Sequence, residues 1–343
     1  MPNVLSTSRV HRFSELRGAK HEKIIEHLGW NFRAEPDARS EKDLMELIEA
    51  GPPLHGILAG HQPFSRPVLR SLVESGRKIG VVPAISRDGV GYENIDVLSA
   101  KELGVQVSIA TGVNARTVAQ YTLGLVLCLT RGIHTQHQEL KRGSWKPFLG
   151  TELSKKRVGV LGFGNVGKES VSLLLGICPR VTVYDPKFAS DPMWVEQQQA
   201  CLRHLSTRGK VTVATDCAQI YETCDLIVLH ASSTSQNHNL LNREVLSTCK
   251  RGVLIVNAAR GELVDSEDMA AALRSGQVGA FATDVYKKEP VPPEDPLFYA
   301  PNTLLTAHSA SMTEQNRPLQ TVRALRNLRA MIEKHGTVDT LVC

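Results

Sequence analysis

The sequence predicts an α/β protein made of two doubly wound, parallel-sheet domains. Short apolar strands alternate with helical stretches along most of the chain, which is the order of elements in a parallel sheet covered by helices on both faces. A glycine-rich turn at residues 162–167 stands between an apolar strand and a helix, where a nucleotide-binding sheet carries its phosphate-binding turn. With 343 residues, the chain has room for about two domains with buried cores.

The first part of the chain supplies one of the two predicted sheets. Its expected strands are residues 3–6, 31–34, 55–60, 79–85 and 105–107, and its expected helices are residues 19–28, 41–50 and a stretch from about residue 66. Ligands bind beyond the carboxyl ends of such strands. The polar groups at those ends are Ser8, Arg9, His11, Arg12, His61, Gln62 and residues 87–91. They are candidates for a binding site, and solvated loop residues are the alternative.

An apolar helix expected at residues 114–130 leads into a polar arm at residues 131–156. The arm contains Trp145 and Phe148, which lie far from any strand pattern. Aromatic residues in such an arm suit burial in a partner subunit or a local cluster on the surface, and the pattern does not separate these two alternatives.

The glycine-rich turn follows a strand at residues 158–161 and predicts a dinucleotide site. Gly162 allows the tight turn, Gly164 lets the backbone approach a pyrophosphate, and Gly167 lets the next helix pack closely on its strand. Asp185 ends the next strand, about 20 residues later, where a carboxylate accepts from the ribose 2′-OH and repels a 2′-phosphate. The sequence therefore predicts NAD(H) and disfavours NADP. A glycine-rich turn without a ligand is the alternative.

Later strand-like runs are each followed by polar or ionisable groups, as expected where strand ends build one site. These runs are residues 226–230, 253–257, 280–284 and 303–306. Residues 188–210 are expected to form an extra helix near the adenine end of the cofactor, without a chemical role. A final helix is expected at residues 318–334 and is expected to return to the first domain.

Composition excludes several other classes of protein. The chain is 42% apolar and 22% charged, as in ordinary globular proteins, and its net charge of +5 is spread out, so no nucleic-acid partner is expected. The start of the chain lacks a secretory pattern, and the longest apolar run, residues 123–129, is too short to span a bilayer. Seven scattered cysteines lack metal-ligand spacing, which predicts reduced thiols, no metal and a cytoplasmic location.

The candidate catalytic groups follow three of the later strands. Arg260 precedes a glycine, and its rigid guanidinium can bind a carboxylate in a bidentate manner. His308, if oriented by a carboxylate such as Glu289, can hold a proton near neutral pH and pass it to a carbonyl oxygen. Taken alone, Arg260 could also be a surface residue, and His308 could also have a structural role. Sequence spacing does not show contact between His308 and Glu289.

Four motifs occur together in a characteristic order. They are Gly-Phe-Gly-Asn-Val-Gly at 162–167, Asn-Ala-Ala-Arg-Gly-Glu-Leu-Val-Asp at 257–265, Asp-Val-Tyr-Lys-Lys-Glu-Pro at 284–290 and Leu-Leu-Thr-Ala-His at 304–308. They closely resemble the D-isomer-specific 2-hydroxyacid dehydrogenases, and residues 86–96 are similar to that family's substrate loop. The resemblance implies Rossmann-like or flavodoxin-like domains, with a discontinuous substrate domain (1–113 and 314–343) around an NAD-binding domain (114–313).

Carried over residue by residue, the resemblance implies an oxidoreductase (EC 1.1.1.-) that interconverts a D-2-hydroxy acid and its 2-oxo acid. Arg260 matches the carboxylate-binding arginine, His308 the acid/base histidine and Glu289 the glutamate that orients it. The implied cofactor contacts are Gly162, Gly164, Asn165, Val166, Gly167, Asp185, His230, Ala231, Ala258, Ala259, Arg260, Asp284, His308 and Ala310, with Asp284 placed for the nicotinamide carboxamide. The implied substrate contacts are the amides of Val90 and Gly91, with Arg260, His308, Arg87 and His61. The family also implies a homodimer embraced by the arm at about 131–156.

The chain departs from the family pattern beside the proposed proton donor. Ala307 stands where most members carry proline, and residues 309–312 replace a run of small residues after the histidine. Gln120 stands where the helix commonly has an acid, and Ser232-Ser233 replace a common Leu-Pro. The wall of the pocket beside His308 is therefore expected to differ from that of other members.

The sequence fits more than one substrate and more than one kind of function. The basic residues Arg9, His11, Arg12, His61 and Arg87 exceed what one carboxylate requires, which suggests a second anion on the substrate, a phosphate or phosphonate. A plain short 2-oxo acid with solvated arginines is the alternative. Two further alternatives are an NADH-responsive, corepressor-like protein-binding relative with little turnover and a dinucleotide-binding protein without turnover.

Overall fold

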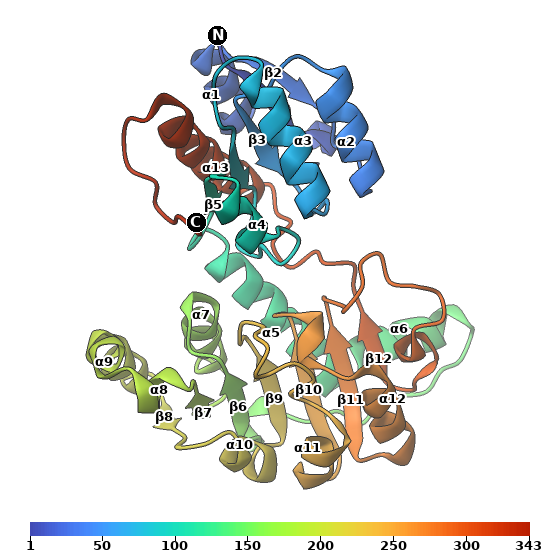
Figure 1. The fold of residues 1–343 in the computed structure, drawn as a ribbon. Helices are drawn as coiled ribbons and strands as arrows, with labels where there is room; N and C mark the ends of the chain where they lie inside the picture. Colours follow the sequence, from blue (N-terminus) through green and yellow to red (C-terminus); the bar gives the residue numbers. More distant parts are fainter. The chain divides into compact units, whose positions relative to one another are not determined.

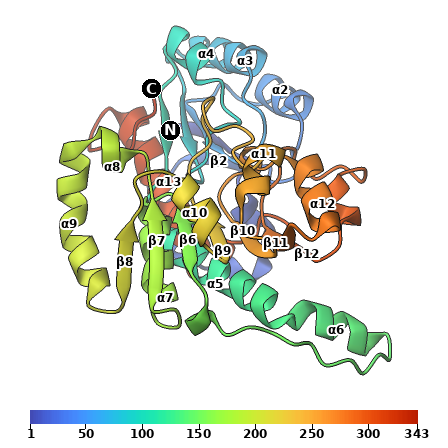
Figure 2. The ribbon, with the colours of Figure 1, turned by 90° about the horizontal axis from the view of Figure 1, so that it is seen from below.

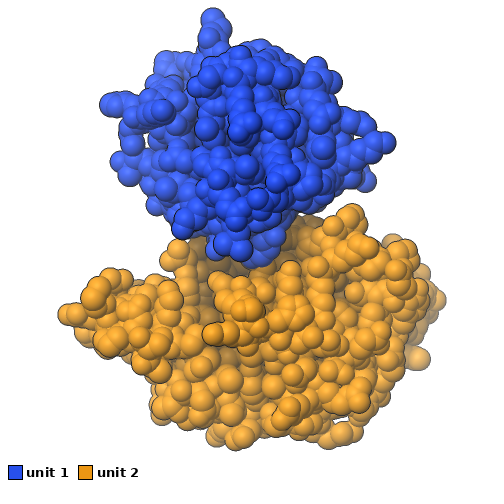
Figure 3. Space-filling view, viewed as in Figure 1, with its two compact units in different colours: residues 1–114, 312–343 blue, residues 115–311 orange.

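The computed structural model describes residues 1–343, which form two compact units (Figure 3). Unit 1 comprises residues 1–114 and 312–343, and unit 2 comprises residues 115–311. Each unit is built on one sheet of parallel strands, with five strands in unit 1 and seven in unit 2 (Figure 1). The predicted fold class, α/β with two doubly wound parallel sheets, is confirmed.

Unit 1 has the strand order β2-β1-β3-β4-β5, the flavodoxin-like order. Its strands are β1 (Asn3–Ser6), β2 (Asn31–Ala34), β3 (Gly56–Ala59), β4 (Ala84–Arg87) and β5 (Val107–Ile109). Its helices are α1 (Lys20–Leu28), α2 (Glu41–Ala50), α3 (Arg66–Arg77), α4 (Val97–Glu102) and the final helix α13 (Asn316–Glu333). Helices α2, α3 and α4 cover one face of the sheet, whereas α1 and α13 cover the other.

Two strands of unit 1 begin later than predicted. Residues 79–83 are irregular, because Gly80 has a φ of +74° and the Val81 amide donates back to Gly76 at the end of α3. The fourth strand therefore starts at Ala84 rather than at residue 79. Val105 likewise donates to Ala100 of the unpredicted helix α4, which moves the fifth strand from 105–107 to 107–109.

Two histidines are partly or fully buried beside α1 in unit 1. His11 bonds to the Ser6 hydroxyl at 3.0 Å, and its ring lies 6.1 Å from that of His21, which is 1% exposed. Burial is the main cause that lowers the pKa of both imidazoles from 6.5. Each histidine is therefore held neutral, and its protonation opposes folding.

Unit 1 is consequently expected to lose stability in mild acid. Because the folded pKa of each histidine lies below the unfolded value, the contribution is complete above pH 6.5 and is lost as the pH falls through the folded values. Urea unfolding between about pH 7.5 and pH 5.5 should show this fall, and His21→Asn should make it shallower. Replacement of the exposed His27 on the same helix is the control. If the free energy of unfolding falls equally steeply with pH in His21→Asn and in the control, the expectation is contradicted.

Unit 2 has the strand order β8-β7-β6-β9-β10-β11-β12, which extends the Rossmann order by one strand. Its strands are β6 (Val158–Leu161), β7 (Arg180–Tyr184), β8 (Lys210–Val213), β9 (Leu226–Leu229), β10 (Val253–Asn257), β11 (Val278–Thr283) and β12 (Thr303–Leu305). Its helices are α5 (Ala115–Arg131), α6 (Ile133–Lys141), α7 (Asn165–Leu174), α8 (Lys187–Ser190), α9 (Pro192–Ser206), α10 (Ala218–Thr223), α11 (Arg243–Thr248) and α12 (Ser266–Ser275).

Both faces of the second sheet are buried. Along β9, Ile227 and Leu229 pack under α10, α11 and α12, whereas Leu226 and Val228 pack under α5, α7 and α9. This arrangement explains why the strands read as continuous apolar runs rather than as alternating patterns. None of the helices in the chain is both long enough and apolar enough to cross a bilayer.

The region predicted as one extra helix is more complex. Residues 187–206 form α8 and α9, and residues 210–213 form β8, which pairs in parallel with β7 at the sheet edge. The helix α9 is therefore the crossover of a β–α–β unit, and the short run Lys-Val-Thr-Val was missed as a strand. The arm also contains an unpredicted helix, α6, which projects beyond the sheet (Figure 2).

Candidate active site

The glycine-rich turn joins β6 to α7 at the point where the strand order of unit 2 reverses. Gly162 has a φ of +100°, and a Cβ there would lie 2.5 Å from the Ala231 amide nitrogen. A Cβ on Gly167 would lie 2.1 Å from the carbonyl oxygen of Gly162. A Cβ on Gly164, by contrast, would meet nothing within 4 Å. Packing within the protein thus requires the first and third glycines, whereas the second leaves open space for a ligand.

The helix after this turn presents its N-terminus to that space. Gly164 is the N-cap, and α7 begins at Asn165, followed by Val166. The first amides of a helix have no partner within the helix, and they attract anions. The turn therefore fits the pyrophosphate of a dinucleotide.

Asp185 follows β7 and closes the same turn. One of its carboxylate oxygens accepts from the Phe163 amide at 2.9 Å, and the other accepts from the Lys187 amide at 3.1 Å. A carboxylate has about four acceptor positions, so acceptor capacity remains for a ribose hydroxyl. The aspartate therefore also shapes the turn, a role that sequence reasoning missed.

His230 follows β9, directly beside Gly162. Its Nε2 lies 2.7 Å from the Ser170 hydroxyl on α7, and burial lowers the pKa of the imidazole to about 3. The ring is neutral at working pH and links the end of β9 to α7. Ser170 was not predicted, because nothing in the sequence distinguishes it from other helix serines.

Arg260 lies in a tight loop after β10. The buried Asn257 side chain accepts from the Ala259 amide at 3.0 Å and donates to the Arg260 carbonyl at 2.8 Å, while Arg260 Nη1 donates to the Ala259 carbonyl at 2.7 Å. A Cβ on Gly261 would lie 2.0 Å from the Tyr286 carbonyl carbon. The glycine therefore lets the loop after β10 touch the loop after β11.

His308 has an unusual backbone, with a φ of +49°. This left-handed conformation is uncommon for a residue other than glycine, and such backbone strain costs about 1–3 kcal/mol. The Asp284 carbonyl accepts from the His308 amide at 2.9 Å, and the Asp284 carboxylate accepts from the amides of Ser309 and Ala310 at 2.8 Å. The Thr306 hydroxyl donates to the same carboxylate at 2.7 Å. Asp284, which is 1% exposed, thus clamps the turn that carries the histidine.

Glu289 and His308 are in direct contact. The distance from His308 Nδ1 to Glu289 Oε2 is 2.7 Å, and Glu289 Oε1 accepts from the Tyr286 amide at 3.1 Å. A carboxylate only accepts, so Nδ1 carries the proton in this bond and Nε2 is the other reactive nitrogen. The pair has the geometry of an oriented acid–base histidine.

Asp284→Asn is expected to lower the rate of any reaction that uses His308 by about tenfold or more, since a misplacement of about 1 Å can cost on the order of 100-fold. The amide NH₂ of the new side chain would face a backbone N–H, so the turn would shift. Thr306→Val removes another bond to the same carboxylate and should change the rate in the same direction. The ¹⁵N imidazole spectrum of His308 checks the shift without cofactor. An unchanged spectrum in both variants would contradict it.

The predicted substrate residues of unit 1 lie around the end of β4. Arg87 is buried, and its guanidinium donates to the Asp88 carbonyl at 2.8 Å and to His61 Nδ1 at 3.0 Å. Val90 and Gly91 follow in the loop, and neither amide donates a hydrogen bond within unit 1. The loop therefore presents two backbone donors on a fixed base.

Among the five basic residues predicted to meet a second anion, His11 and Arg12 contact other parts of unit 1. The lowered pKa of His11 leaves its ring neutral, and the ring packs on Phe32 and on Ser6. Arg12 forms an ion pair with Asp37 at 3.0 Å. Arg87 and His61 bond to each other at 3.0 Å, as described above.

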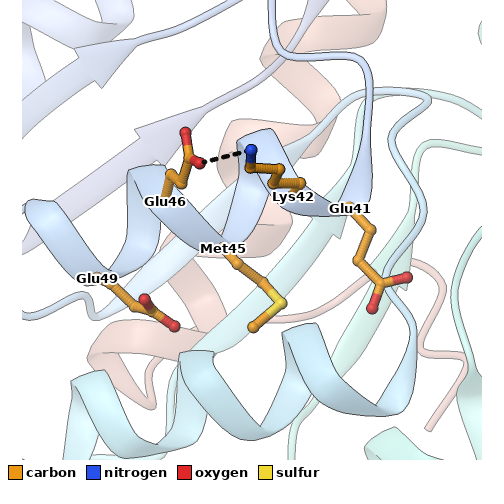
Figure 4. A pocket seen from close by; sticks show the side chains of 5 residues that line it. All are labelled: Glu41, Lys42, Met45, Glu46 and Glu49. Carbon is orange, nitrogen blue, oxygen red and sulfur yellow. Dashed lines mark ion pairs between the residues drawn. The ribbon is translucent and has the colours of Figure 1, made fainter.

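A shallow hollow beside α2 in unit 1 contains none of the predicted site residues. It is lined by Glu41, Lys42, Met45, Glu46 and Glu49, with Lys42 paired to Glu46 at 3.7 Å (Figure 4). These are side chains of one solvated helix. The chemistry instead gathers in unit 2, where Arg260, Glu289 and His308 lie on loops after the neighbouring strands β10, β11 and β12.

Comparisons with known proteins point to one family of dehydrogenases. Residues 123–310 match the family described as D-isomer specific 2-hydroxyacid dehydrogenase, NAD binding domain. D-3-phosphoglycerate dehydrogenase of Methanocaldococcus jannaschii is 34% identical over 253 residues, which cover 72% of this chain and 44% of that protein. Glyoxylate reductase of Thermofilum pendens is 31% identical over 255 residues, which cover 73% of this chain and 71% of that protein. The apo structure of D-lactate dehydrogenase from Escherichia coli matches with a TM-score of 0.79 and 25% identity, over 100% of both chains.

Proposed function

The chain belongs to the D-isomer-specific 2-hydroxyacid dehydrogenases, a family of NAD-binding oxidoreductases, and we propose on that premise that it interconverts a 2-oxo acid and its D-2-hydroxy acid. The observation that carries the proposal is the 2.7 Å contact between Glu289 and His308. The contact provides an oriented proton donor on the same sheet edge as the dinucleotide turn and Arg260.

Each of the three residues has a distinct role in the proposed reduction. Arg260 binds the substrate carboxylate and polarises the adjacent carbonyl. His308 gives a proton to the carbonyl oxygen, and Glu289 stabilises the imidazolium that precedes this transfer. NADH, when bound, supplies the hydride for C2 of the substrate. In the oxidation, His308 takes the hydroxyl proton instead.

NAD(H) rather than NADP(H) is the proposed cofactor. Support comes from Asp185, whose charge would repel a 2′-phosphate and whose carboxylate keeps acceptor capacity for a ribose hydroxyl. Titration of the protein with NADH and with NADPH tests this preference. Asp185→Ser should narrow the difference between the two affinities.

We propose that unit 2 binds the cofactor and that unit 1 contributes to binding the substrate. The match to the NAD-binding family covers residues 123–310, which fall within unit 2. Unit 1 would then hold the substrate through the amides of Val90 and Gly91, which donate nothing within their own unit. Because the chain spans 44% of the length of the phosphoglycerate dehydrogenase relative, that protein's activity is not carried over whole.

A short 2-oxo acid is the proposed substrate class. The case for a second anion rests on fewer basic residues, because His11 and Arg12 have structural partners. NADH oxidation with a panel of 2-oxo acids, including glyoxylate, hydroxypyruvate and phosphorylated three-carbon acids, is the deciding experiment. A clear preference for the phosphorylated acids would restore the second-anion hypothesis.

The same panel separates an enzyme from a binding protein. Turnover of at least one 2-oxo acid supports the dehydrogenase. Tight NADH binding with no turnover of any acid would instead support an NADH-responsive, corepressor-like role or a dinucleotide-binding protein without turnover.

A cytoplasmic homodimer is the proposed assembly. The arm exposes large apolar side chains, with Trp145 84% and Leu149 97% exposed, and α6 projects from unit 2 (Figure 2). Exposed apolar groups of this kind mark association surfaces. Light scattering tests the dimer, and a monomer would refute it. Seven free thiols support the location.

A further inference from the structure

One buried ion pair of unit 1 joins the loop after β4 to the final helix. Arg317, in the first turn of α13, donates from Nη2 to Asp88 Oδ2 at 2.6 Å. The side chains of Arg317 and Asp88 are only 8% and 1% exposed. No step of the proposed chemistry uses either residue.

Further hydrogen bonds support both members of the pair. The Asp88 carboxylate also accepts from the Ser8 hydroxyl after β1 and from the Thr321 hydroxyl on α13 at 3.1 Å. Arg317 Nη1 donates to Gln320 at 3.1 Å. Three parts of unit 1 therefore meet at one carboxylate: the end of β1, the loop after β4 and α13.

This carboxylate stands two residues before the proposed amide donors. Around it, the Asp88 carbonyl accepts from the Arg87 guanidinium at 2.8 Å, and the Gly89 carbonyl accepts from the Ala110 amide at 2.9 Å. The base of the loop is thus held at two successive residues, Asp88 and Gly89. Val90 and Gly91, which follow, are held by no amide hydrogen bond of unit 1.

We propose that Asp88 and Arg317 are positioning residues, which fix the loop so that the amides of Val90 and Gly91 meet the substrate carboxylate; this presupposes the proposed dehydrogenase function. Burying two charges is costly, and well-packed apolar groups often stabilise a fold as well as a buried ion pair does. A buried pair does, however, define one geometry, because its hydrogen bonds are directional. The pair therefore sets where the loop stands, and α13 determines how well substrate is captured.

The test uses the double variant Asp88→Asn/Arg317→Met, which leaves no unpaired buried charge and so separates geometry from folding. KM for the best 2-oxo acid is expected to rise by about tenfold or more, because a misplacement of about 1 Å can cost on the order of 100-fold. The value of kcat and the Kd for NADH are expected to stay within about twofold of wild type. Assays are run at a temperature at which circular dichroism shows a folded protein.

A matched control lies on the same helix. Arg323 pairs with Asp339 at 2.6 Å, and both side chains are about 40% exposed. Arg323→Met/Asp339→Asn removes an ion pair of the same type, and it should change neither KM nor the melting temperature. Arg317→Lys keeps the charge next to Asp88 with fewer donors, and its KM should be intermediate.

The outcomes separate this proposal from the proposed function. An unchanged KM in the folded double variant, or equal losses in kcat and NADH affinity, would overturn the positioning role while leaving the dehydrogenase in place. If the double variant does not fold, a wild-type KM in Arg317→Lys would overturn the positioning role instead. If the wild-type protein turns over none of the 2-oxo acids, the proposed function itself is overturned.

Discussion

Replacement of His308 by alanine is expected to lower kcat by about 10²- to 10⁴-fold, the range that a positioned acid–base group contributes. The imidazole is oriented by Glu289 through Nδ1, and its backbone is held at a φ of +49° by Asp284. Removal of the ring leaves the developing alkoxide without its oriented proton donor. Steady-state NADH oxidation measures the loss, and fluorescence titration should give a Kd for NADH within about twofold of wild type.

Glu289→Gln is the companion variant. The amide oxygen can still accept from Nδ1, but the negative charge that stabilises the imidazolium is lost. Its loss of kcat should therefore be smaller than that of His308→Ala. Wild-type rates in His308→Ala would exclude the histidine as proton donor.

Replacement of Arg260 by alanine is expected to lower kcat/KM for the 2-oxo acid by about 10²-fold or more, chiefly through KM. A bidentate guanidinium contributes two charge-assisted hydrogen bonds, each of about 1.5–3 kcal/mol. Arg260→Lys keeps the charge but not the planar pair of donors, so it should recover only part of the loss. Initial rates over a range of substrate concentration give both parameters.

Arg251 supplies the control for this prediction. It stands before the amino end of β10, the strand that Arg260 follows, and it donates to the Ser275 carbonyl at 2.9 Å. Arg251→Ala should leave KM unchanged. An Arg260→Ala protein with wild-type KM would remove Arg260 as the carboxylate anchor.

The parts of the site that depend on local geometry were predictable from the sequence. Gly162 and Gly167 are required by a positive φ and by close backbone contact, which a short motif records. Each buried parallel strand reads as an apolar run, so most strands were found where they occur. The edge strand β8 was missed because its side chains are largely exposed, which removes the apolar signal.

Contacts between distant residues were not predictable in the same way. His308 and Glu289 are 19 residues apart, on loops after different strands, and Asp88 and Arg317 are 229 residues apart. Their pairing depends on which strands are neighbours, and no local pattern encodes that. The clamp by Asp284 was hidden for a related reason, since its partners are backbone amides that every sequence has.

The close contact at Gly261 helps to hold the loops that carry Arg260 and His308 at a fixed separation. Gly261 touches the Tyr286 backbone, the Tyr286 amide bonds to Glu289, and Glu289 bonds to His308, so Arg260 and the imidazole are joined by a short mechanical linkage. In the proposed reaction, this linkage sets the distance between Arg260, which binds the carboxylate, and His308, which protonates the carbonyl. A 3-oxo acid would carry its carbonyl one bond, about 1.5 Å, further from the carboxylate. In the proposed reaction, this fixed spacing favours a carbonyl at the 2-position, and a methyl group at residue 261 would change the spacing.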